Sequence, residues 1–160
     1  LYRVRYVGEE STAAVSGKQT AGSEQRALRR QLEAWHGQVG GDTSWMLSYL
    51  SHEDRFVRYA ARIALESQPV SEWRAQAAAQ TQPRAAIHAM LALARQGNVE
   101  DLETILQTLT KVDFAALPRS DQLGWLRTFE VAFARHGQPN PAWREKLLQL
   151  FDRFYPSNTY

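Results

Sequence analysis

The sequence predicts an all-α chain in which about eight helices pack as antiparallel pairs into an α-α superhelix, preceded by one N-terminal strand. Three observations support this class. Apolar residues recur at helical spacing from Ser23 onward, and turns rich in Gly, Pro and Ser separate the stretches. One helical segment recurs forty residues later in the chain. Alternation typical of a strand occurs only in residues 1–7, so this sequence cannot supply a sheet of its own.

The amino-acid composition excludes several classes of function for this sequence. The 160 residues are 44% hydrophobic and 22% charged, which is typical of a globular domain with a core. The 19 Lys and Arg residues and the 17 Asp and Glu residues leave a formal net charge of +2, too little to attract nucleic acid or an anionic membrane strongly. No window approaches the roughly 20 apolar residues of a membrane span. Cysteine is absent, which excludes disulfides, thiolate metal sites and c-type haem attachment within this sequence.

The first 22 residues differ from the rest. In residues 1–7, Tyr2, Val4 and Tyr6 alternate with arginines, which predicts a β-strand. A lone strand leaves its backbone groups unpaired, so we expect it to join a sheet outside this sequence. Residues 8–22 are rich in Ser, Thr, Ala and Gly, as in a linker. We therefore assign residues 1–22 to the end of an upstream domain plus a linker.

Residues 23–160 are predicted to form a helical array. Capping residues, prolines and glycines mark the ends of the helices. The array is expected to continue past Tyr160, because Pro156, Ser157 and Asn158 are typical of the start of another helix. The apolar positions assigned to the core include Phe56, Leu123 and Leu126. The predicted helices cover about residues 23–36, 43–50, 51–66, 71–79, 83–96, 98–109, 120–136 and 141–154.

Two internal similarities favour a repeat architecture. Residues 92–97 (ALARQG) recur as residues 132–137 (AFARHG). A period of about 40 residues is typical of HEAT and armadillo arrays. An offset of 28 residues relates a second set, in which Ala61, Ala64 and Leu65 align with Ala89, Ala92 and Leu93. Unequal spacing is common where each helix pair contacts only its neighbours, so these offsets indicate an α-solenoid.

Residues 50–65 (LSHEDRFVRYAARIAL) closely resemble a HEAT repeat. Small residues at its centre allow neighbouring helices to approach, and Asp54 lies where a carboxylate meets a positive helix end. Arg58 is expected to bridge repeats. The next repeat has Ala86 at the position of Arg58, so an Asp–Arg ladder would be incomplete. The residues that carry the motif are Leu50, Asp54, Val57, Arg58, Ala60, Ala61, Ala64 and Leu65.

A wider resemblance covers most of the chain. Residues 1–8, 10–12, 24–30 and 52–66 are similar to large multidomain bacterial haem-binding proteins. In that family a β-propeller similar to soluble sugar or sorbosone dehydrogenases precedes a HEAT-like array, and a c-type cytochrome module with a Cys-x-x-Cys-His motif follows it. The resemblance implies that residues 1–7 close the propeller. It also implies a periplasmic or cell-envelope location, and that haem c and any propeller cofactor belong to the parent protein.

The polar residues offer no catalytic, cofactor-binding or metal-binding set. No two histidines have the helical spacing of a zinc site. His36 and His136 each precede a glycine at a helix end, where an imidazole favours the negative end of the dipole. His52 lies in a turn and is expected to be solvent-facing or locally bonded. The acidic pairs at residues 53–54 and 100–101 fall at helix starts, where carboxylates stabilise exposed amides.

Two arginine clusters form a candidate interaction surface: Arg55, Arg58 and Arg62, and Arg26, Arg29 and Arg30. Such clusters near tryptophans could contact nucleic acid, or the arginines could pair with acidic residues of neighbouring repeats. The small net charge favours ion pairing. The tryptophans follow apolar stripes, which favours core packing over exposed binding anchors. They are Trp35, Trp45, Trp73, Trp125 and Trp143.

These observations and the resemblance lead to one main functional hypothesis. The segment is expected to be a non-catalytic scaffold that connects a propeller domain and a cytochrome domain of the same chain. One alternative is a protein-interaction module that binds a partner on its concave face. Another is a HEAT protein that binds nucleic acid.

Overall fold

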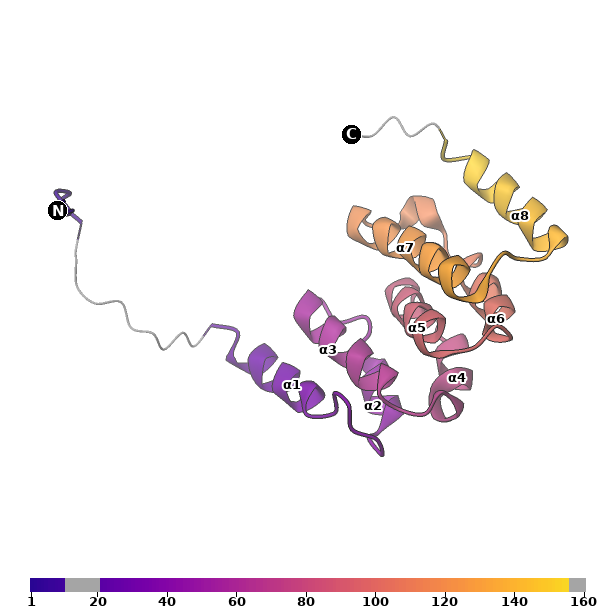
Figure 1. Ribbon diagram of the computed structural model, residues 1–160, viewed down its shortest axis with the longest axis horizontal. Coiled ribbons are helices and arrows are strands. Elements are labelled where there is room, and N and C mark those ends of the chain that lie inside the picture. Colours follow the sequence, from indigo (N-terminus) through magenta and orange to yellow (C-terminus); the bar gives the residue numbers. More distant parts are fainter. Residues whose placement is uncertain (11–20, 156–160) are drawn as a thin grey trace.

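The computed structural model describes residues 1–10 and 21–155 (Figure 1). Within them are eight α-helices and one short 3-10 helix, which confirms the all-α class. Most of the predicted linker, and the predicted helix start at Pro156, lie outside the described residues. The elements are α1 (Ser23–Glu33), α2 (Thr43–Ser48), α3 (Arg55–Glu66), α4 (Val70–Ala78), α5 (Pro83–Gln96), α6 (Asp101–Leu109), η1 (Phe114–Ala116), α7 (Arg119–His136) and α8 (Pro141–Asp152).

The helices are arranged in two rows. In the first row α1 contacts α3, α3 contacts α5, and α5 contacts α7 (Figure 1). In the second row α2 contacts α4 and α4 contacts α6. Contacts between the rows join helices that are close in sequence, such as α2 with α3, α4 with α5, and α5 with α6. Each helix therefore packs mainly against its near neighbours along the chain.

The core lies between the two rows and is lined by small and branched side chains. Trp73 and Trp125 are fully buried, and each indole has a hydrogen-bond partner. The Nε1 of Trp73 donates to the carbonyl of Gln68 at 3.2 Å, and that of Trp125 donates to the carbonyl of Leu109 at 2.9 Å. The predicted core residues of α3 are buried as expected: Val57, Ala60, Ala61, Ala64 and Leu65.

Local sequence sets the helix starts. Asp54 caps α3, because its Oδ1 accepts from the backbone N–H groups of Phe56 at 2.7 Å and Val57 at 3.3 Å. The helix therefore begins after Asp54 and not at Ser51 as predicted. Pro83 occupies the first turn of α5, where its missing N–H is harmless, as predicted.

The predicted strand at residues 1–7 is not confirmed. These residues have no regular secondary structure, and residues 1–10 are all exposed. A strand is stable only when a partner satisfies its N–H and C=O groups, and the described part of the chain contains no other strand. The alternating pattern of residues 1–7 therefore does not produce a strand within the described residues.

Three predicted core residues are exposed instead. Phe56 is 52% exposed, Leu123 55% and Leu126 41%. Phe56 precedes the buried Val57, and one residue turns a helix by about 100°, so Phe56 leaves the packed face. In α7 the buried side includes Trp125 and residues 128–129, and the two leucines lie outside it.

The forty-residue repeat marks equivalent helix ends. Residues 92–97 end α5 and residues 132–137 end α7, and these two helices are neighbours in the first row. The N–H of each glycine bonds to the carbonyl four residues earlier, although the φ angle is −74° at Gly97 and 86° at Gly137. The Gly97 N–H donates to the Leu93 carbonyl at 2.8 Å, and the Gly137 N–H donates to the Phe133 carbonyl at 3.0 Å. The residues related by the 28-residue offset lie in α3 and α5, which are also neighbours.

Helix α8 packs on the end of the rows through aromatic rings. Phe151 of α8 lies 5.5 Å from Trp125 and 5.4 Å from Phe129 of α7, measured between ring centroids. Phe154, just beyond α8, lies 4.5 Å from Phe114 of η1. Aromatic pairs at these separations add stabilisation beyond their buried area, so this cluster holds α8 in place.

Candidate interaction surface

A group of charged side chains lies on α3 and α5, which we call the His88 surface. Arg84, His88 and Arg95 are spaced four and seven residues apart on α5, so they share one side of that helix. Arg58 and Arg62 have the same four-residue spacing on α3, the neighbouring helix. The surface is defined by five basic or imidazole groups and two carboxylates: Arg58, Arg62, Arg84, His88, Arg95, Glu66 and Asp121.

The carboxylates of this surface join neighbouring helices. Glu66 of α3 accepts from the Arg95 Nε of α5 at 2.9 Å and also pairs with Arg62 of its own helix. Arg84 Nε of α5 lies 2.8 Å from Asp121 Oδ2 of α7. The Glu66 side chain is 5% exposed and that of Asp121 is 7% exposed. Because buried carboxylates need charged or hydrogen-bonding partners, these pairs fix the packing of three successive helices.

The second row has a matching pair. Arg74 Nε of α4 lies 2.7 Å from Asp101 Oδ1 of α6. Asp101 is buried and also accepts from the backbone N–H of Asn98 at 2.9 Å. Ion pairs between adjacent helices therefore occur in both rows. The arginines that form these pairs, Arg74, Arg84 and Arg95, lie outside the two clusters for which pairing between repeats was predicted.

Arg58 acts differently from its predicted role. Its Nη1 donates to the carbonyls of His52 and Glu53, the latter at 2.8 Å, so it closes the turn before its own helix. Among the described residues no carboxylate forms an ion pair with it. Burial, and next the charge of Arg84, hold the pKa of Arg58 below its usual range, while Asp121 and Asp54 oppose this. The Arg58 guanidinium bonds to carbonyls of the turn before its own helix, and it does not form the predicted bridge to a neighbouring repeat.

His88 lies at the centre of these charges. Burial lowers its pKa to about 4, and the positive charges of Arg58, Arg62 and Arg84 act in the same direction, opposed by Asp121. The imidazole is therefore neutral at pH 7. Its Nδ1 is buried and has no hydrogen-bond partner within the described part of the chain. The surroundings of His88 are therefore poorly hydrated and have a positive electrostatic potential.

The other predicted arginines are placed apart from one another. Arg62 is buried with its guanidinium 5.2 Å from the ring centre of Tyr59, and Arg55 lies 4.7 Å from that of Phe56. Arg29 Nε lies 3.0 Å from Glu33 Oε1 within α1, and Arg30 is exposed. The structure therefore does not join the two arginine clusters into one continuous exposed stripe.

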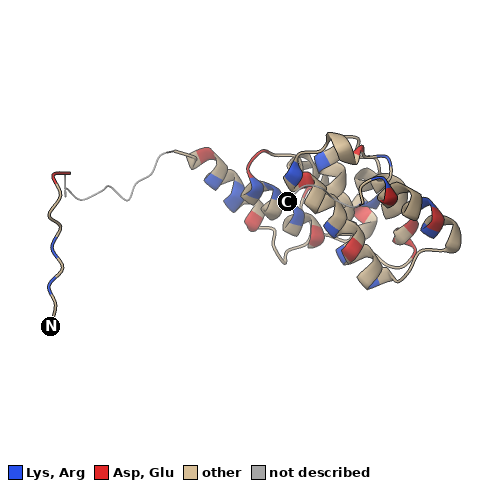
Figure 2. Cartoon of the chain, turned by 90° about the horizontal axis from the view of Figure 1, so that it is seen from above, with Lys and Arg blue, Asp and Glu red and all other residues tan. Residues whose placement is uncertain are grey.

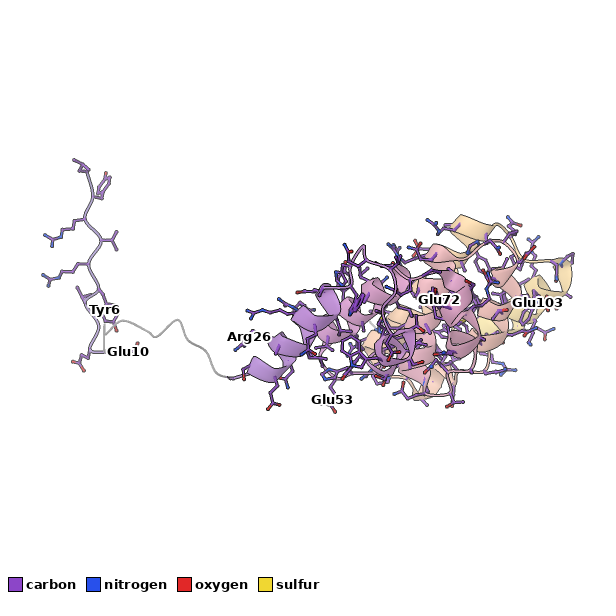
Figure 3. All side chains as sticks on the ribbon, turned by 90° about the horizontal axis from the view of Figure 1, so that it is seen from below. Tyr6, Glu10, Arg26, Glu53, Glu72 and Glu103 are labelled. Carbon is purple, nitrogen blue, oxygen red and sulfur yellow. The ribbon has the colours of Figure 1, made fainter. Side chains whose placement is uncertain are left out.

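Arg26 and Arg29 line a hollow of about 170 Å³ between α1 and the start of α3, with Asp54 and Phe56 on its other side. Arg26 also donates to the carbonyl of Ala21 at 2.7 Å. Figure 3 shows Arg26 on α1 at one end of the helices and Glu103 toward the other end. This hollow is open and lies at one end of the rows.

The remaining histidines make local or packing contacts. His36 Nε2 lies 2.9 Å from the carbonyl of Ala60, so it links the end of α1 to α3. His52 Nδ1 accepts from the Asp54 N–H at 3.0 Å, in agreement with a local role. His136 is the last residue of α7, as predicted. No three His, Asp or Glu side chains in residues 1–10 and 21–155 gather into a group that could hold a metal ion.

The tryptophans all contribute to packing, as predicted. Trp73 and Trp125 are fully buried, and the other three, Trp35, Trp45 and Trp143, are partly buried against the core. Charged residues of both signs are interspersed along the helices (Figure 2). No helix in the described ranges is both long enough and apolar enough to cross a membrane.

Sequence reasoning missed His88, Arg84 and Arg95 as parts of one surface. The available signal was their spacing along α5 at residues 84, 88 and 95, which places polar side chains on one side of an otherwise apolar helix. No family model, curated protein or solved structure matches the chain.

Proposed function

We propose that this chain is a non-catalytic scaffold: a HEAT-like α-solenoid that holds other protein domains in a fixed relation. The observation that carries this proposal is the set of ion pairs between successive helices, Glu66 with Arg95 and Arg84 with Asp121 in one row and Arg74 with Asp101 in the other. Ion pairs between a buried carboxylate on one helix and an arginine on a neighbouring helix oppose sliding of the two helices past each other. A stack of this kind suits a spacer.

The sequence resemblance supplies the context of the proposal. It implies that a propeller similar to sugar or sorbosone dehydrogenases would precede this segment and that a c-type cytochrome module would follow it. In that arrangement the helices would set the distance between the two domains, in the periplasm or cell envelope. Haem c and any propeller cofactor would be held by the parent protein, and no residue of this segment would take part in the reaction.

The stiffness can be tested directly because the chain contains no cysteine. Spin labels on Ala27→Cys in α1 and Ala142→Cys in α8 would report the end-to-end distance by pulsed electron paramagnetic resonance. Both positions are exposed. A rigid spacer gives one narrow distance distribution. The pair Ala75→Cys and Ala134→Cys spans fewer helices and sets the width expected for close neighbours. A much broader distribution for the long pair would contradict the spacer role.

The context is tested by the gene itself. Sequencing on both sides of the segment is expected to show a propeller upstream and a Cys-x-x-Cys-His motif downstream. A gene without either feature would contradict the connector between propeller and cytochrome, while the distance measurement would still decide whether the segment is stiff.

A second candidate function is protein binding by the first row of helices. The surplus of arginine over carboxylate in the His88 surface favours it, because unpaired positive charge on a well-packed face is suited to a negatively charged partner.

A further inference from the structure

The His88 surface carries more positive charge than its own carboxylates neutralise. Four guanidinium groups meet two carboxylates, Glu66 and Asp121, and His88 is neutral at pH 7. Glu66 is shared by Arg62 and Arg95, and Arg58 bonds to uncharged carbonyls. Asp54 also acts on Arg58, so with this carboxylate counted one formal positive charge remains on this part of α3 and α5.

The arginines retain capacity for another ligand. A guanidinium has five N–H donors, and the pairs described use few of them. The side chains of Arg84 and Arg95 are 25% and 46% exposed. Tyr59 is 57% exposed beside Arg62, and Leu91 is partly buried between His88 and Arg95 on α5. Charged donors thus lie next to an aromatic ring and an aliphatic side chain, a combination common in protein-binding surfaces.

We propose that the His88 surface binds an acidic peptide segment of a partner protein. Side-chain carboxylates of the peptide would accept from Arg84, Arg95 and Arg58, and its apolar groups would pack on Tyr59. This goes beyond the scaffold role, because the partner need not belong to the same chain. Planar carboxylates match the two-pronged geometry of guanidinium groups, so glutamate and aspartate side chains suit these donors.

A protein partner fits better than nucleic acid. A phosphate backbone is a continuous line of charge that is bound by many lysines and arginines together. Here the positive charges are few, and the carboxylates of Glu66 and Asp121 lie among them. A peptide can place its few carboxylates beside the arginines and its uncharged residues beside the acidic groups, whereas a nucleic acid cannot space its charges in this way.

Binding can be measured on the 160-residue chain by fluorescence anisotropy with a fluorescein-labelled peptide of alternating Glu and Ala. A peptide of alternating Gln and Ala is the uncharged control. We expect the acidic peptide to bind and the control peptide not to bind, with affinity falling as salt rises. Arg95→Gln should weaken binding about fivefold to tenfold, since the loss of a contact worth about 1.4 kcal/mol is tenfold.

Arg74→Gln is the matched control variant. Arg74 is also a half-exposed arginine paired with a buried carboxylate, but it belongs to the second row. It should bind the acidic peptide as the unaltered chain does. Equal weakening by Arg74→Gln and Arg95→Gln would overturn the proposal, and so would the absence of binding to the unaltered chain. Displacement of the peptide by lower concentrations of an oligothymidylate of equal charge would overturn it in favour of nucleic acid.

A second measurement needs no arginine variant. Carboxylates bound near His88 change the electric field at its ring, so at pH 7, where the peptide is fully ionised, the acidic peptide should shift the ring proton signals of His88 in NMR. His88→Gln identifies those signals among the four histidines. Unchanged His88 ring signals at pH 7 with the peptide bound would show that the peptide lies elsewhere, and would overturn this site.

Discussion

Glu66 of α3 and Arg95 of α5 are joined across the first row of helices, with 2.9 Å between Oε2 and Nε. The same carboxylate neutralises Arg62, whose side chain is only 10% exposed. The buried Glu66 therefore pairs with the buried Arg62 in its own helix and with the half-exposed Arg95 in α5, the next helix of the row. This relation makes Glu66 a junction between two helices and connects its packing to the geometry of the row.

Removing the charge of Glu66 is expected to be costly. Glu66→Gln leaves Arg62 buried without its carboxylate, and loss of one partner of a buried pair costs about 3 kcal/mol of unfolding free energy. Urea unfolding followed by circular dichroism gives this value. The control is Glu130→Gln, which removes the exposed pair with Arg127 and should change stability by less than about 1 kcal/mol. Equal effects of the two substitutions would contradict the assignment of Glu66.

The cap of α3 provides a second prediction. Asp54→Ala removes the acceptor for the N–H groups of Phe56 and Val57, so the unfolding free energy should fall by about 1 kcal/mol. Asp54→Asn keeps a side-chain oxygen at the same position and should recover most of the loss. The midpoints of urea unfolding for the three chains test this. An equally large loss in the Asn variant would show that the charge of Asp54, and not its hydrogen bonds, matters.

The stability of the chain should depend on pH through His88. The unfolded chain binds a proton at this residue near pH 6.5, but the folded chain binds it only near pH 4. The unfolding free energy contributed by neutral His88 is therefore complete above pH 6.5 and is lost as the pH falls to about 4. At about 1.4 kcal/mol per pKa unit the loss is about 3 kcal/mol.

His88→Gln isolates the contribution of His88 to this pH dependence, because the variant keeps a neutral polar side chain at residue 88 and leaves every carboxylate in place. Urea unfolding at several pH values between 7 and 4 should show a shallower decline for the variant than for the unaltered chain. The charges that face His88 are those of Arg58, Arg62, Arg84 and Asp121. Parallel curves for the two chains would mean that His88 titrates normally.

Trp125 should be more sensitive to truncation than the partly buried Trp143. It is fully buried, contacts Phe129 and Phe151 at ring-centroid distances of 4.7 and 5.5 Å, and donates to the Leu109 carbonyl. Trp125→Ala should lower the unfolding free energy by about 4 kcal/mol. Trp143→Ala, at a partly buried position, should lower it by less. Thermal unfolding of both variants compares them, and a larger effect at Trp143 would contradict the packing described for α7 and α8.

The fold class could be predicted because apolar residues recur at helical spacing along the chain and several helices have clear end signals. Pro83, the Gly97 end of α5 and the Gly137 end of α7 mark boundaries by backbone chemistry alone. The burial of Val57 and its alanine neighbours follows from spacing along one helix. The exposure of Leu123 and Leu126 could not be predicted in this way, since it depends on which sides of α7 meet α5 and α8.

The candidate surface was harder to predict for a similar reason. Arg58 and Arg62 stand four residues apart in the sequence, yet one bonds to local carbonyls and the other is buried beside Glu66. The partners that decide this come from other turns and helices. Arg84 pairs with Asp121, which is 37 residues away in the sequence, and Arg95 pairs with Glu66, which is 29 residues away. Spacing within one helix indicates which side chains share a side, but not which helix covers them.

The two rows have a consequence for how quickly the chain folds. In the described part of the chain the main contacts join helices that are at most three apart in sequence, such as α3 with α5 and α2 with α5, so none of them requires the first and last helices to meet. Low contact order reduces the entropy lost in loop closure before stabilising contacts form. Folding can begin at any neighbouring pair and extend in both directions. The expected rates are those of helical proteins, in milliseconds or less.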